Sequence, residues 1–146
     1  KALSSHQVKE MDVCWLDTSN DTLWMVELKA FDHAENIYYK KVDISQNEVA
    51  DYWINELFLK SLHTLTMLET NRSGTSQCLV NGLRNETSFK IVHLINVIYG
   101  QEEYLSFWKD KLEDKLKPYM KIYNVSSLSV LPYKMAKEKG WLSWIV

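Results

Sequence analysis

The chain has few of the residues from which common catalytic and metal-binding motifs are built. Only four glycines occur, and none of them stands in a phosphate-binding loop, a dinucleotide fingerprint or a nucleophile elbow. The two cysteines form no Cys-x-x-Cys pair, and the four histidines are scattered without an HExxH motif. We therefore expect a non-catalytic protein with no metal and no cofactor.

Long apolar runs and an excess of one charge are also lacking. No apolar stretch approaches the roughly 18 residues that a membrane span needs. The formal net charge is only −2, which gives no electrostatic reason to expect nucleic acid as a partner. The chain begins at Lys1, so we expect a mature or trimmed product, and we interpret residues 141–146 as a final strand rather than the approach to a removed membrane anchor.

The segment from Ser45 to Thr70 has the clearest pattern in the chain. Ser45 and Glu48 match a capping box, and Gly74 follows where a helix would stop. Apolar or small residues then recur at a spacing of three to four, which is typical of an amphipathic helix: Ala50, Ile54, Leu57, Ser61, Leu65 and Leu68. This helix needs an apolar surface to pack on.

Alternating patterns on both sides of the helix predict that surface. We expect strands at residues 8–16, 22–31 and 36–42 before the helix, and at 76–83, 89–99 and 104–108 after it. A second helix is expected over 109–123, ending or kinking at Pro118, followed by a loop or short strand over 124–131 and helical turns over 133–139. The prediction is a single extracellular-type domain over 1–146, of α+β class. One long and one shorter helical segment pack on one face of an antiparallel sheet.

Four Asn-x-Ser/Thr triplets indicate the cellular compartment. They begin at Asn20, Asn71, Asn85 and Asn124, none has proline in the middle, and all four lie at expected turns. Chance would supply about one such acceptor site in a chain of this composition. We therefore predict an N-glycosylated protein that is secreted or faces the extracellular or luminal side of a membrane.

The two cysteines, Cys14 and Cys78, leave two alternatives open. A disulfide between them would close a loop of about 65 residues and stabilise the fold by about 4 kcal/mol in the chain-entropy model. The other interpretation is a pair of buried free thiols. The glycosylation sites favour the disulfide because both modifications belong to the secretory pathway.

Two stretches carry a family resemblance. The segment Asn20–Phe31, which leads through a further predicted strand to the long helix, and the segment Ile98–Phe107 resemble parts of a minimal MHC class I-like platform. The type meant is that of stress-induced or viral ligands of natural-killer receptors. The resemblance implies an antiparallel platform with adjacent first and fifth strands, which would bring Cys14 beside Cys78. It also implies an immune receptor as partner, in immune recognition or in viral immune evasion.

Two functions fit these observations. The first is a non-catalytic recognition module that binds a protein receptor, with Tyr38, Tyr39, Tyr52 and Trp53 as candidate anchors. The second is a secreted carrier that holds a small apolar ligand between helix and sheet. Six tryptophans and eight tyrosines suit both functions, so the sequence alone does not separate them.

Overall fold

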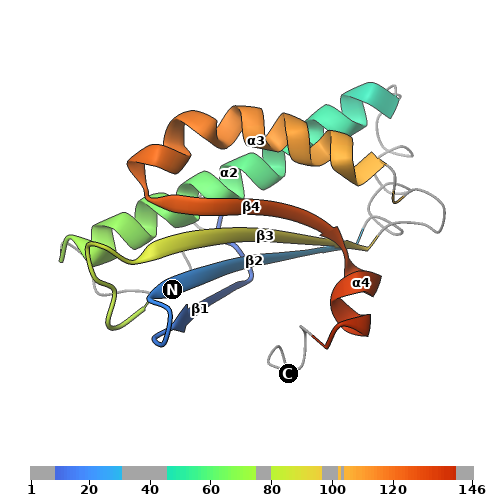
Figure 1. Ribbon diagram of the computed structural model, residues 1–146. Coiled ribbons are helices and arrows are strands. Elements are labelled where there is room, and N and C mark those ends of the chain that lie inside the picture. The colour runs from blue at the N-terminus through green and yellow to red at the C-terminus, as the bar shows by residue number, and fades with distance from the viewer. Residues whose placement is uncertain (1–8, 31–45, 75–79, 97–101, 103, 141–146) are drawn as a thin grey trace.

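The computed structural model describes residues 9–30, 46–74, 80–96, 102 and 104–140, and within them it shows one sheet and three helices. The elements in chain order are β1 (Val13–Asp17), β2 (Thr22–Ala30), α2 (Gln46–Arg72), β3 (Ser88–Asn96), α3 (Tyr104–Ile122), β4 (Val125–Pro132) and α4 (Tyr133–Glu138). Figure 1 shows α2 and α3 side by side on one face of the sheet, with α4 beyond the end of β4.

The strands lie in the order β1-β2-β3-β4. β1 and β2 form an antiparallel hairpin, whereas β2 pairs with β3, and β3 with β4, in parallel. The parallel pairs arise because α2 and α3 each carry the chain back along the sheet before the next strand begins. Consequently β2, β3 and β4 all start at the same end of the molecule, which we call the polar end (Figure 1).

The predicted α+β fold with helices packed on a sheet is confirmed, but the sheet is not purely antiparallel. The helices α2 and α3 each lead from one strand to a parallel neighbour, so only the β1–β2 pair is antiparallel among the described strands. The antiparallel platform implied by the family resemblance differs from this sheet in the same way. The predicted strands at 36–42 and 141–146 lie outside the described residues.

Two further element predictions were wrong. Residues 104–108 form the first turn of α3 rather than a strand, because Leu105, Leu112 and Leu116 make one buried stripe along that helix. Of the predicted strand over 76–83, the described residues 80–83 contain a turn at Asn81 and Gly82. Gly82 has a φ of +88°, a conformation that glycine adopts without strain.

Helix α3 also continues through Pro118, where the sequence predicted that the helix ends or kinks. Pro118 is exposed, so its ring meets solvent rather than a neighbouring element. Leu116 is fully buried and Met120 packs against the core, so contacts on both sides of the proline hold the segment to the sheet. Packing therefore outweighs the hydrogen bond that the proline removes.

The core lies between the sheet and the two long helices. The predicted stripe of α2 is buried from Ile54 onwards, at Ile54, Leu57, Ser61, Leu65 and Leu68, whereas its first residue, Ala50, is half-buried. They meet side chains of β2 and β3 that point to the same side, chiefly Leu23, Met25, Phe89, Ile91 and Ile95. Each large apolar side chain buried there contributes roughly 1.5–3 kcal/mol to folding. The two long helices therefore cover one face of the sheet, and the opposite face has a separate set of contacts.

Candidate functional site

The face of the sheet turned away from α2 and α3, which we call the outer face, is strongly apolar. Strand register aligns its side chains in three rows: Trp15, Trp24, Lys90 and Ser127; then Val13, Val26, Val92 and Ser129; then Leu28, Leu94 and Leu131. On β2 the alternating residues Trp24, Val26, Leu28 and Ala30 make up the more apolar side of the strand. The structure directs that side away from the long helices.

A hollow of about 410 Å³ lies on this outer face. We call it the outer groove, and its lining residues are Trp15, Trp24, Val26, Lys90, Val92, Leu94, Ser127, Ser129 and Leu131. Ala136 of the short helix α4 is buried against Val26, Val92 and Leu94, so α4 borders the end that is remote from Lys90. The groove has the size and the mainly apolar lining of small-molecule sites.

The row that contains Trp15, Trp24, Lys90 and Ser127 carries the charged side chain of the groove. Trp15 is 44% exposed although it is a large apolar residue. The ammonium group of Lys90 lies 4.8 Å from the ring centroid of Trp24, close enough for a cation–π contact. Among the described residues that line the groove, Lys90 is the only charged one. The outer groove therefore combines an apolar body with one positive charge.

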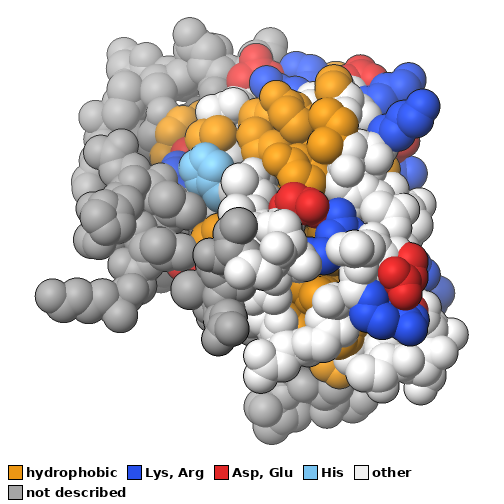
Figure 2. Space-filling model, turned by 90° about the vertical axis from the view of Figure 1, so that its left-hand side faces the viewer, with side chains coloured by type: hydrophobic (Ala, Val, Ile, Leu, Met, Phe, Trp, Pro, Cys, Tyr) orange, Lys and Arg blue, Asp and Glu red, His pale blue; other side chains and the backbone are white. Residues whose placement is uncertain are grey.

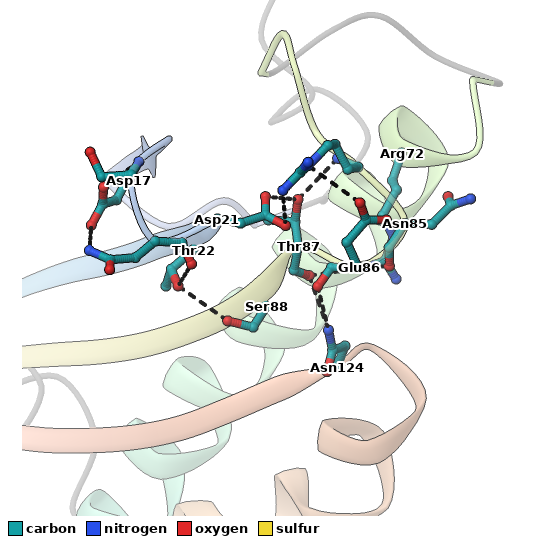
Figure 3. A network of polar contacts seen from close by, with 12 residues as sticks. Asp17, Asp21, Thr22, Arg72, Asn85, Glu86, Thr87, Ser88 and Asn124 are labelled. Atoms are coloured by element: carbon teal, nitrogen blue, oxygen red, sulfur yellow. Dashed lines mark hydrogen bonds and ion pairs between the residues drawn. The ribbon is translucent and has the colours of Figure 1, made fainter.

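A network of polar contacts occupies the polar end of the sheet (Figure 3). Arg84 forms an ion pair with Asp21 at 2.8 Å, and the Thr87 hydroxyl donates to Asp21 Oδ1 at 2.7 Å. The backbone N–H of Arg84 in turn donates to Thr87 Oγ1 at 3.0 Å. The hydrogen bonds from Arg84 and Thr87 hold the pKa of Asp21 below its ordinary value.

Arg72, at the end of α2, ties this network to the helical layer. Its guanidinium donates to the carbonyls of Asn85 (3.2 Å) and Thr87 (3.3 Å), pairs with Glu69 and lies over the ring of Phe89. Figure 2 views the molecule from this end, and charged side chains of both signs lie beside one another below a hydrophobic patch over the helices. Acids and bases are matched here, which is typical of a structural network.

All four predicted glycosylation sites lie at this polar end. Asn20, Asn85 and Asn124 are exposed, and Asn71 is half-buried with its amide donating to Val80 O at 2.8 Å. Each stands where an element ends or begins: the β1–β2 turn, the end of α2, the turn before β3 and the turn before β4. The parallel topology thus gathers four sites that are far apart in the sequence.

The amides of these asparagines also take part in the turns. Asn124 has a φ of +56° and donates from Nδ2 to the carbonyls of Glu86 and Thr87, both at 3.2 Å. Asn20 donates to Asp17 Oδ2 at 2.7 Å. An N-linked glycan replaces one of the two amide hydrogens, so a modified Asn124 keeps one of its donors. The asparagines at positions 20 and 124 therefore stabilise their turns, in addition to being possible attachment points for a glycan.

A second polar cluster is buried under α2. Glu27 is 1% exposed and accepts from Lys60, and His93 is fully buried with Nε2 3.0 Å from Ser61 Oγ. Burial raises the pKa of Glu27, while the hydrogen bond from Lys60 opposes this. Burial lowers the pKa of His93 to about 3, and the charge of Lys60 adds to the effect. Neither group reaches solvent, so this cluster is not accessible to a substrate.

The predicted aromatic anchors have different surroundings. Trp53 is buried, with Lys29 Nζ lying 4.3 Å from its ring centroid. Tyr52 is 38% exposed and meets Trp53 edge-on at a centroid distance of 5.1 Å. Tyr38 and Tyr39 lie outside the described residues. Only Tyr52 of the two described candidates offers much surface to a partner.

Sequence reasoning missed two exposed aromatics at the start of α3. Tyr104 is 56% exposed and Phe107 is 51% exposed. Lys111 lies 4.8 Å from the centroid of Phe107 and forms a 2.8 Å ion pair with Asp51 of α2, the neighbour of Tyr52. Reading residues 104–108 as a strand hid this arrangement, because helical spacing is what brings Phe107 and Lys111 together.

The predicted disulfide remains a prediction. Cys14 lies on β1 and packs against the core from the helical side. Burial raises the pKa of its thiol to about 11, and Glu10 adds to the rise. Cys78 lies outside the described residues, so the structure does not test the pairing.

Within the described part of the chain, no helix is long and apolar enough to span a membrane, and no group of three or more metal-ligating side chains comes together. A comparison of the chain with protein-family models, with curated proteins and with solved structures finds no match.

Proposed function

We propose that this chain is an exported glycoprotein that acts as a non-catalytic recognition module for a protein receptor. The observation that carries the proposal is the exposed aromatic surface of the helical layer, which consists of Tyr52, Tyr104 and Phe107 around the Asp51–Lys111 ion pair. Large aromatic residues are enriched in protein interfaces, where a few of them carry much of the binding energy.

The arrangement of the glycosylation sites supports this assignment. Tyr52 and Asn71 stand at opposite ends of α2, about 28 Å apart along the helix axis at 1.5 Å per residue. Glycans at the polar end would therefore leave the aromatic surface uncovered. In line with the family resemblance, an immune receptor is the partner class to test first.

The test is cell binding by a fluorescent tetramer of the protein secreted from glycosylating cells. Leukocyte populations that bind the tetramer should show an apparent affinity at least tenfold lower for the Phe107→Ala variant, because truncation of a hot-spot residue costs about 2 kcal/mol or more and about 1.4 kcal/mol corresponds to tenfold. Tyr133→Ala is the matched control, since Tyr133 is a 37% exposed aromatic on α4. Equal loss with both variants, or no binding population at all, would contradict the proposal.

A second candidate function is transport of a small apolar ligand, and the outer groove favours it. The ligand site was predicted between the helices and the sheet, whereas that layer holds closely packed, fully buried side chains such as Phe89 and Leu65. The groove lies on the opposite face of the sheet.

A further inference from the structure

We propose that the outer groove is a binding site for a small amphipathic carboxylate, such as a medium-length fatty acid. This site is independent of the proposed receptor-binding function, because the groove and the exposed aromatic surface lie on opposite faces of the sheet. Three features of the groove favour such a ligand: the charge of Lys90, the change from polar to apolar side chains along β3, and the volume of the groove.

Lys90 supplies the one charge among the described residues that line the groove. In the described part of the chain no carboxylate forms an ion pair with Lys90. Asp17 lies near enough for the charge of Lys90 to lower its pKa, but its carboxylate accepts from Asn20 and from the N–H of Ser19. The ammonium group of Lys90 therefore remains available to pair with an acidic group that enters the groove.

The groove changes from polar to apolar along β3, as the order of the side-chain rows shows. Lys90 lies level with Ser127 of β4, Val92 lies level with Ser129, and Leu94 lies level with Leu131. The surface thus passes from a cation and a hydroxyl to purely apolar side chains within four residues of β3, or about 13 Å at 3.3 Å per residue. A ligand with an acidic head and an apolar tail matches this gradient when it lies along β3.

The size of the groove and the position of its charge disfavour other kinds of ligand. A volume of about 410 Å³ suits a small molecule, and α4 borders the apolar end through Ala136. A neutral apolar ligand would leave Lys90 without an anionic partner and cover part of its hydration shell, which costs free energy. A phosphate or nucleotide would place charge on the valine and leucine rows. A monocarboxylate with an aliphatic tail satisfies both ends.

Isothermal titration calorimetry with decanoate, below its micelle concentration, tests the proposal, and decanol serves as the uncharged probe. We expect the wild-type protein to bind decanoate at least tenfold more tightly than decanol. Lys90→Met should remove that preference and leave decanol binding unchanged. Lys111→Met, which removes a lysine of the helical layer, should behave like the wild type.

A second variant tests the groove itself. Ser129→Phe places a ring over the apolar floor from the edge of β4, and it should abolish binding of both probes while the thermal unfolding temperature stays near that of the wild type. Equal affinity of the wild type for both probes, unchanged decanoate binding by Lys90→Met, or no heat of binding with either probe would each overturn the proposal.

Discussion

Glu27 of β2 and His93 of β3 are register partners on adjacent parallel strands, and both side chains are buried beneath α2. Each has one contact to that helix: Lys60 donates to Glu27, and Ser61 lies within hydrogen-bond distance of His93. The Ser61 hydroxyl donates to Leu57 O, so His93 Nε2–H must be the donor to Ser61. In the described part of the chain, Glu27 Oε2 and His93 Nδ1 have no hydrogen-bond partner.

This pair makes stability depend on pH. The pKa of His93 falls to about 3 in the folded protein, so the unfolded chain binds a proton more readily between about pH 6.5 and pH 3. The stabilisation is complete above pH 6.5 and is lost as the pH falls. Chemical denaturation should show a loss of about 3 kcal/mol between pH 6.5 and pH 4, at about 1.4 kcal/mol per pH unit.

Three variants separate the contributions to that slope. His93→Leu should flatten it, whereas His63→Gln, which changes a half-buried histidine on α2, should keep it. The raised pKa of Glu27 acts in the opposite sense, because it removes stability as the pH rises through the folded pKa. Glu27→Gln should therefore steepen the rise in stability as the pH increases above the ordinary pKa of a glutamate. A wild-type slope that survives His93→Leu would contradict this explanation.

Thr87 is the buried centre of the polar network, so its hydroxyl should matter more than its methyl group. Thr87→Val removes the donor to Asp21 and the acceptor for the Arg84 N–H, and leaves that N–H without its partner. The free energy of unfolding should fall by about 1–3 kcal/mol in unglycosylated protein. Thr66→Val, at an exposed position of α2, is the control and should change it by less than about 0.5 kcal/mol. A Thr87→Ser variant that is no more stable than Thr87→Val would refute the role of the hydroxyl.

Pro118 should weaken the helix that it occupies. It is exposed within α3, so Pro118→Ala removes no core contact and restores a backbone donor. We expect the free energy of unfolding to rise by about 1–3 kcal/mol in urea denaturation. Lys117→Ala at the neighbouring exposed position should be close to neutral. A destabilised Pro118→Ala variant would show that the proline has a packing role.

Local patterns predicted the α2 stripe and the β1–β2 hairpin because both are fixed by residues close in sequence. They did not predict which strand lies beside which after each helix, because Ser88 and Val125 carry no local mark of a parallel partner. The outer groove was missed for a related reason. Alternation on β2 shows that Trp24, Val26 and Leu28 share a side, but only the position of α2 decides that this side is the outer face.

The aromatic surface was missed because residues 104–108 suit both helix and strand. Tyr104, Phe107 and Trp108 are residue types typical of strands, and the deciding contacts come later in the chain, at Leu112 and Leu116. The four glycosylation sites were predicted from sequence alone. Their gathering at one end of the sheet follows from the parallel topology and needed the structure.

We propose that this chain is exported as a glycoprotein whose glycans gather at the polar end and leave the helical surface free. Glycopeptide mass spectrometry of the chain, expressed with an export signal in glycosylating cells and compared before and after enzymatic removal of N-glycans, tests it most directly. The account predicts glycans on Asn20, Asn71, Asn85 and Asn124. Exported protein in which all four asparagines are unmodified would contradict it.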